Sequence, residues 1–198
     1  MDNTEIRVQK YLVNFCKALP PHVDSWRSVL QDSGKPLQSL TNLCEQQRSI
    51  QKVTLSNFED FREAQNVILH RITIGIEEEL LCIKKLVEKL NECNIDLKNK
   101  LLVFERSTLN LNWEENSELI RGNGSQPPLT KLLHYSLQLL NYFTTKAKDI
   151  SDKFKSLNLE NEKSVEQLKN SFDVDIDQKI VRNLLALTQY VDNEKEII

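Results

Sequence analysis

Residues 76–104, IEEELLCIKKLVEKLNECNIDLKNKLLVF, carry the most regular pattern in this chain. Apolar residues recur there in alternating steps of four and three, with one polar residue among them: Ile76, Leu80, Ile83, Val87, Leu90, Asn94, Leu97, Leu101 and Phe104. Such a heptad seam keeps one face of a helix against a neighbouring helix. The stretch therefore predicts a long helix with a seam that packs against a partner helix.

Two features of this predicted helix leave alternatives open. Asn94 is either buried, where a polar seam residue fixes register or partner choice, or lies where the seam reaches the surface. A second apolar row lies roughly 100° or more around the helix; its members are seven residues apart and Glu88 interrupts it: Ile74, Leu81, Ile95 and Leu102. A helix that is apolar on two sides is typically sandwiched between neighbours.

A second seam follows a break in the pattern at residues 110–128. Its members again step by three and four: Leu129, Leu133, Ser136, Leu140, Phe143, Ala147, Ile150, Phe154 and Leu157. The break contains glycines and a Pro-Pro pair, which are typical of a loop. Two helices of this kind joined by one loop predict an antiparallel hairpin over residues 70–157.

Shorter amphipathic segments flank this hairpin. Helices are expected over residues 4–69, with a stop or a kink at Pro20-Pro21, an interruption at Gly34 to Pro36, and a capping box of Ser56 and Glu59. Further helices are expected over residues 162–193. The predicted fold class is all-α: one helical domain of residues 1–198, built as a bundle on a long antiparallel heptad hairpin with shorter flanking helices.

Composition limits the classes of function. The 198 residues include only four glycines and five prolines, which favours long helices over a turn-rich sheet. The net charge is -3 and the basic residues are scattered, so we expect no direct binding to nucleic acid. The first residues form no secretory signal, and no stretch has the ~20 apolar residues of a membrane span. We therefore expect a cytoplasmic and nuclear protein with reduced cysteines.

The sequence shows none of the common catalytic or metal-binding patterns. The three histidines lie far apart, and none has a second ligand one helical turn away. Asp173, Asp175 and Asp177 begin like a calcium loop, but Gln178 and Leu184 stand where that loop needs Gly and Glu. No phosphate loop or nucleophile motif occurs either. We expect a protein that is not an enzyme and uses no cofactor or metal.

Residues 26–46 carry a resemblance to a known family. The segments WRSVLQD at 26–32 and PLQSLTNLCEQ at 36–46 show the spacing W-x-S-x-L-x-D, then P-L-x-S-L-x-N-L-x-E-Q. This spacing resembles the AIRIM-type ribosome maturation factors, small helical proteins associated with the AFG-type AAA ATPases. The order of a long heptad helix, a Pro-containing loop, a second long helix and two short ones adds support.

The resemblance implies a non-catalytic adaptor subunit of an AAA ATPase complex. Its implied partners are the AFG-type ATPases and a second small helical subunit, the cyclin-dependent-kinase-interacting protein. The implied role is cytoplasmic maturation of the large ribosomal subunit, by release of an assembly factor from precursor particles. The heptads alone also suit a different class, a structural coiled-coil subunit of an assembly such as a kinetochore or tethering complex.

Candidate partner-binding residues are the motif residues and one loop tryptophan. Trp26 is either core or an interface anchor, Asp32 either caps a turn or meets a partner, and Trp113 either folds back under the loop or waits for a partner. The full predicted set is Trp26, Leu30, Asp32, Pro36, Leu37, Leu40, Asn42, Leu43, Glu45, Gln46 and Trp113.

Overall fold

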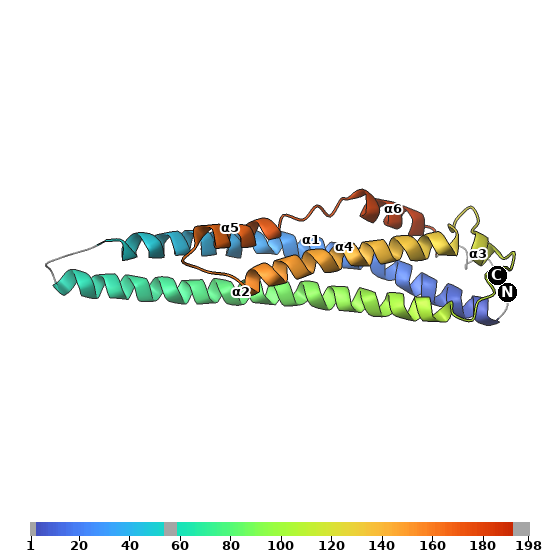
Figure 1. Cartoon of the computed structure of the whole chain (residues 1–198), viewed down its shortest axis with the longest axis horizontal. Coiled ribbons are helices and arrows are strands. Elements are labelled where there is room, and N and C mark those ends of the chain that lie inside the picture. Colours follow the sequence, from blue (N-terminus) through green and yellow to red (C-terminus); the bar gives the residue numbers. More distant parts are fainter. Residues whose placement is uncertain (1–2, 54–58, 192–198) are drawn as a thin grey trace. The chain divides into compact units, whose positions relative to one another are not determined.

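The computed structural model describes residues 3–53 and 59–191, and within them every regular element is a helix (Figure 1). The helices are α1 (Asn3–Gln51), α2 (Glu59–Ser107), α3 (Glu118–Arg121), α4 (Leu129–Lys155), α5 (Glu162–Ser171) and α6 (Lys179–Thr188). The predicted all-α bundle with a long helix pair is thereby confirmed. Ser56, half of the expected capping box, lies outside the described residues.

The chain divides into two compact units, which are described separately. The first contains the described residues up to Arg27, then Asn91–Thr145, and the described residues from Asp175 on. The second contains Ser28–Leu90 and Lys146–Val174. Helices α1, α2 and α4 contribute residues to both units. That residues 1–198 form a single domain stays a prediction.

Helix α1 is continuous, so the predicted end of a helix at Pro20-Pro21 and the predicted interruption at Gly34 to Pro36 are wrong. Each proline removes a backbone donor, which normally breaks a helix or kinks it. The apolar spacing nevertheless passes through both sites in steps of three and four, and its members are buried: Leu12, Phe15, Leu19, Val23, Trp26, Val29, Ser33, Leu37, Leu40 and Cys44. Burial of this long face outweighs the local preference of the prolines.

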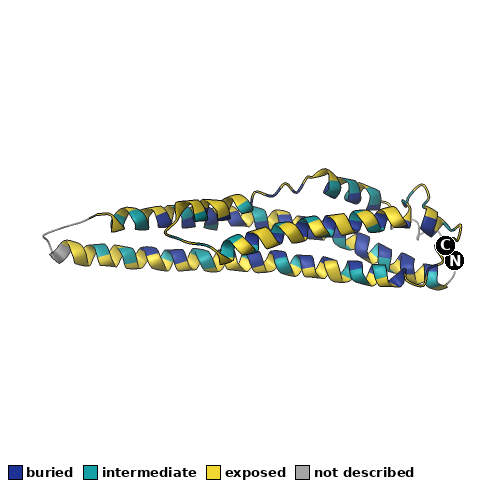
Figure 2. Cartoon of the chain, viewed as in Figure 1, coloured by how far each residue is buried: buried dark blue, intermediate teal, exposed yellow. Residues whose placement is uncertain are grey.

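In the first unit, α1 and α2 run antiparallel and α4 lies against both. The rings of Phe15 on α1 and Phe104 on α2 stack with centroids 6.1 Å apart. Further along, Trp26 of α1 hydrogen-bonds to Asn94 of α2, and its ring centroid lies 4.8 Å from that of Phe143 on α4. Along the helices in Figure 2, buried and exposed residues alternate as amphipathic packing requires.

In the second unit, the later part of α1 packs against the earlier part of α2. A Cβ atom on Gly75 would lie 3.2 Å from Leu43 Cδ1, so the two helices approach closely there. Arg48 donates to the Leu159 carbonyl oxygen at 3.1 Å, and Lys169 donates to Gln38 Oε1 at 2.9 Å. These bonds, together with the buried apolar face of α5, hold residues 159–172 against α1.

The first heptad seam packs within the chain. In the second predicted seam the register is partly wrong, because Leu132 and Leu139 are buried whereas Leu133 and Leu140 are only half-buried. In the first seam, every member is buried except Leu80, which is half-buried. The second row of α2 is different, because Ile74, Leu81 and Ile95 remain 43%, 53% and 56% exposed. The expectation that α2 is sandwiched on both sides is therefore not met by the described part of the chain.

The predicted loop at 110–128 holds a short helix that the sequence pattern did not reveal. Ser117 caps α3, and its Oγ accepts from the Ile120 N–H. Gly122 follows with φ 82°, a left-handed conformation that suits glycine. The buried Gln126 accepts a hydrogen bond from Gln9 of α1 at 2.9 Å. The loop is thus tied to the start of α1.

Candidate interaction surfaces

A buried polar cluster joins α1, α2 and α4 in the first unit. Trp26 Nε1 donates to Asn94 Oδ1 at 3.0 Å, and Asn94 Nδ2 donates to the Phe143 carbonyl oxygen at 3.1 Å. The indole can only donate and the carbonyl can only accept, so the amide orientation of Asn94 is determined by its neighbours. Asn94 is 6% exposed, which decides in favour of the buried alternative.

This cluster also decides the role of Trp26 within the chain. Its side chain is fully buried, and its only ring nitrogen is already paired with Asn94. A polar residue in an apolar seam destabilises the fold unless its polar atoms form hydrogen bonds. Asn94 forms its hydrogen bonds only in one alignment of the three helices. The cluster therefore specifies the register of α1, α2 and α4.

His22 lies beside the same cluster. Its ring meets Phe143 edge-on with centroids 4.8 Å apart, and Cys93 Sγ lies 3.0 Å from Nδ1. Burial lowers the pKa of His22 to about 4, although the Cys93 backbone and the Asp96 charge act in the opposite direction. The imidazole is therefore neutral near pH 7. Its Nε2 atom is buried without a hydrogen-bond partner.

Next to His22 lies a surface groove of about 470 Å³. Its lining mixes cationic, anionic and apolar groups, including Lys17, Asp96, Leu97 and Lys100. No group of three or more metal-ligating side chains occurs among the residues that the structure describes. Lys100 and Asp96 form an ion pair one helical turn apart, which lowers the charge available to a ligand.

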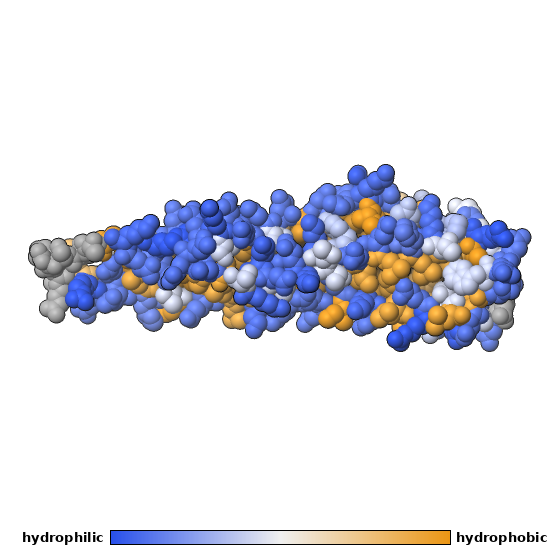
Figure 3. All heavy atoms as spheres, viewed as in Figure 1, coloured by the Kyte–Doolittle hydropathy of each residue, from blue (hydrophilic) through white to orange (hydrophobic). Residues whose placement is uncertain are grey.

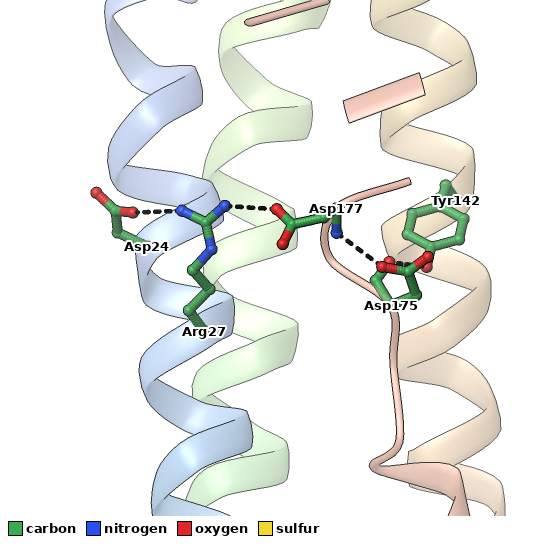
Figure 4. A network of polar contacts seen from close by, with 5 residues as sticks. All are labelled: Asp24, Arg27, Tyr142, Asp175 and Asp177. Atoms are coloured by element: carbon green, nitrogen blue, oxygen red, sulfur yellow. Dashed lines mark hydrogen bonds and ion pairs between the residues drawn. The ribbon is translucent and has the colours of Figure 1, made fainter. Parts of the chain in front are cut away.

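An exposed ion-pair network ties the segment before α6 to α1 and α4 (Figure 4). Arg27 contacts Asp24 at 3.3 Å and Asp177 at 2.9 Å. Tyr142 donates to the Asp175 carbonyl oxygen at 2.7 Å, and the Asp177 N–H donates to the Asp175 carboxylate at 2.9 Å. Burial, and secondarily the Asp175 charge, raise the pKa of Tyr142. The three-aspartate segment thus forms a turn anchored by hydrogen bonds.

The predicted partner-binding residues divide between core and surface. Trp26, Leu37 and Leu40 are buried, whereas Leu30, Pro36 and Leu43 are half-buried. The polar members Asp32, Asn42, Glu45 and Gln46 are exposed on the second unit. Trp113, in the first unit, is 40% exposed. Asp32 accepts a hydrogen bond from Ser28 within α1 at 3.2 Å, so it caps no turn.

A second surface lies where α1 ends and α2 begins. A groove of about 490 Å³ runs there beside two of the predicted residues, Glu45 and Gln46, and is otherwise lined by Ser49, Ile50, Ile68, Arg71 and Ile72. Ile68 is 47% exposed. In Figure 3 most of the visible surface is hydrophilic, with apolar residues gathered in separate patches. The structure thus leaves apolar side chains next to the predicted polar residues.

The comparison with family models decides the affiliation of the chain. The model described as CA109-like, Ribosome biogenesis protein C1orf109-like, matches residues 6–190. The chain belongs to this family. The match confirms the AIRIM-type resemblance that residues 26–46 carry. No curated protein matches the chain at a significant level.

In this chain the motif combines two physical roles. Its apolar residues supply much of the buried face of α1, and its polar residues line the exposed side of the same helix. Arg27 and Asn94 were not among the predicted site residues, although both join distant segments. Asn94 had a sequence signal, as the one polar residue of its seam, whereas Arg27 had none. No helix among the described residues is long and apolar enough to cross a membrane.

Proposed function

We propose that this protein is a non-catalytic adaptor subunit of an AAA ATPase complex that acts in cytoplasmic maturation of the large ribosomal subunit. In this role it helps the complex to release an assembly factor from precursor particles. The observation that carries the proposal is the family match over residues 6–190, because it associates nearly the whole chain with ribosome biogenesis.

The proposed partners are the AFG-type AAA ATPases and the second small helical subunit, with indirect association to precursor particles. The proposed location is the cytoplasm and the nucleus. Support comes from the exposed polar residues of the motif and from the exposed apolar side chain of Ile68, which lines the groove beside Glu45 and Gln46. Exposed apolar residues rimmed by polar ones are typical of protein-binding surfaces.

A non-catalytic role agrees with the causes of the pKa shifts in this chain. Burial is the main cause of the pKa shifts of His22, Cys44 and Tyr142. Cys44 is a core residue of α1, and Tyr142 holds a backbone carbonyl in place. Packing therefore accounts for these pKa shifts. A perturbed pKa indicates a catalytic residue only when such structural causes do not explain it.

Affinity purification of the full chain from cells, followed by mass spectrometry, tests the proposal. We expect an AFG-type ATPase and the second small subunit in near-stoichiometric amounts, and precursor large-subunit proteins at lower abundance. A set of other coiled-coil chains without an ATPase would favour the structural coiled-coil alternative. Full incorporation of the chain into such an assembly would refute the adaptor role.

A further inference from the structure

One side of α2 in the second unit carries exposed apolar residues at heptad spacing. Val67, Ile74 and Leu81 are 47%, 43% and 53% exposed, and each follows the previous one by seven residues. They lie more than about 100° around the helix from the buried seam. Heptad spacing on an exposed helix face is the pattern by which a helix packs along another helix. We call Val67, Ile74 and Leu81 the outer row.

Charged residues flank the outer row in a symmetric order around Leu81. Glu77 and Glu78 precede it by four and three residues, and Lys84 and Lys85 follow it by three and four. All four side chains are exposed. Glu78 and Lys85 lie on one side of the row, while Glu77 and Lys84 lie on the other, because residues seven apart share a position on the helix.

This order of charges complements itself when two copies of the helix run in opposite directions. With Leu81 opposite Leu81, Glu78 of each copy faces Lys85 of the other, and Glu77 faces Lys84. The two-fold symmetry gives every pairing twice. A parallel pair in register would instead place like charges opposite each other, which is unfavourable. The charges therefore select a second, antiparallel copy.

We propose that two copies of this chain associate through the exposed face of their α2 helices around Leu81, antiparallel and centred on Leu81. The ion pairs set direction and register, since exposed pairs add little affinity of their own. The interface does not rest on the proposed role in ribosome maturation. A partner chain can occupy other surfaces at the same time.

Glu88 limits the strength of this association. It takes the next position of the outer row and would lie opposite Ile74 of the second copy. Within the chain its carboxylate lies 3.9 Å from Lys84 Nζ, so Glu88 forms an ion pair with Lys84 of the same helix. In this register Leu81 is the one member of the outer row that meets the outer row of the second copy, so the apolar contact is short. The dimer is therefore weak and reversible, and it forms at high protein concentration.

A charge-exchange experiment with the full chain tests the pairing. One variant carries Glu77→Lys and Glu78→Lys, and the other carries Lys84→Glu and Lys85→Glu. Analytical ultracentrifugation over a wide concentration range compares each variant, their equimolar mixture and the wild type. As a control for the Glu→Lys variant, Asp149→Lys with Asp152→Lys makes the same charge change at exposed positions of α4.

We expect the wild type and the control to dimerise reversibly. Each charge variant alone should dimerise at least about tenfold more weakly, a loss equivalent to ~1.4 kcal/mol, because every ion pair becomes a repulsion. The mixture should recover dimers, since all pairs are again of opposite sign. A wild type that is monomeric at every concentration would overturn the proposal, and so would a mixture that fails to recover.

Cross-linking tests the register independently. In a Cys82→Ser background, two Leu81→Cys copies should form a disulfide when oxidised glutathione accepts the two electrons, because the symmetry places the two positions face to face. Ile74→Cys should not, since its two copies would be about 20 Å apart along the axis. Equal cross-linking of both would overturn the antiparallel register. Loss of the ATPase complex on Leu81→Asp, with a monomeric wild type, would assign the row to a different helical protein and refute self-association.

Discussion

At the scale of single residues, the pairing of Trp26 with Asn94 is the most informative contact of the structure. If either side chain is removed alone, the other loses its hydrogen-bond partner in this contact, and both side chains are buried. An unsatisfied buried polar group costs more free energy than the hydrogen bond itself contributes. The pair should therefore behave as a unit under mutation.

We predict that Trp26→Phe lowers the free energy of unfolding by about 1–3 kcal/mol for the unpaired amide, plus a cavity cost. Asn94→Leu should destabilise for the same reason. The double variant should lose clearly less than the sum of the two, because it leaves no unpaired partner in this contact. Urea unfolding of the four proteins measures this coupling. Additive losses would contradict it.

His22 predicts a specific dependence of stability on pH. Its pKa is about 4 in the folded chain and 6.5 in the unfolded chain, so the unfolded chain binds more protons between those values. The contribution of His22 is therefore fully present above pH 6.5 and is lost as the pH falls towards 4. The loss amounts to roughly 3 kcal/mol at most.

Thermal or urea unfolding at a series of pH values tests this prediction. The matched variant is His22→Leu, which has no titrating group at this position. Its stability should change less steeply with pH between about 6.5 and 4 than that of the wild type. If the stability of the two proteins changes with pH in the same way, the pKa of His22 does not differ between the folded and the unfolded chain, and the prediction is wrong.

At the scale of elements, two glycines inside helices provide a matched pair. A Cβ atom at Gly34 on α1 would meet nothing within 4 Å, whereas one at Gly75 on α2 would lie 3.2 Å from Leu43. Alanine favours a helix interior over glycine by up to about 1 kcal/mol. Gly34→Ala should therefore stabilise the protein by about that amount.

Gly75→Ala should gain less, or lose stability, because Leu43 must move to accommodate the new methyl group. Urea unfolding of the two variants beside the wild type gives the comparison. An equal gain for both would mean that α1 and α2 do not approach closely at Gly75.

Two leucines of α2 distinguish the seam from the outer row. Leu90 is 1% exposed and Leu81 is 53% exposed, on the same helix and in the same unit. Leu90→Asp should lower the free energy of unfolding by several kcal/mol, because it buries a charge without a partner. Leu81→Asp should change it by less than about 0.5 kcal/mol. Chemical unfolding at low protein concentration, where self-association is absent, is the measurement.

At the scale of the whole molecule, the exposed polar residues of the motif are the clearest candidates for assembly. Asn42 and Glu45 are exposed, and Asn42 accepts a hydrogen bond from Gln38, one turn away on the same helix. Their joint replacement by alanine should leave the stability of the isolated chain nearly unchanged. Affinity for the ATPase or the second subunit should fall by about 1 kcal/mol or more.

The matched control replaces Arg7 and Lys10, which are exposed on α1 outside the motif, by alanine. Binding measured by titration with the purified partners should be unaffected in this control. If the Asn42 and Glu45 variant binds as tightly as the control, the motif does not form the docking surface. Early melting of the variant would instead assign these residues to the fold.

The spacing of apolar residues alone determined the helical class and the seam from Ile76 to Phe104, while the residue identities within 26–46 carried the family resemblance. These features are local, because a helix places residues three and four apart on one face whatever surrounds it. The continuity of α1 through Pro20 and Pro21 was misread, although the same spacing runs through both. The prolines are a local signal, and the burial that outweighs them depends on helices far away in sequence.

Only the tertiary structure decided which polar and apolar residues are covered. Asn94 is buried because Trp26 lies 68 positions earlier in the chain and Phe143 lies 49 later, and both reach it. Leu81 stays exposed because none of the described residues packs over that side of α2. Periodicity shows that a face is apolar, but only the positions of the other helices show whether something covers it.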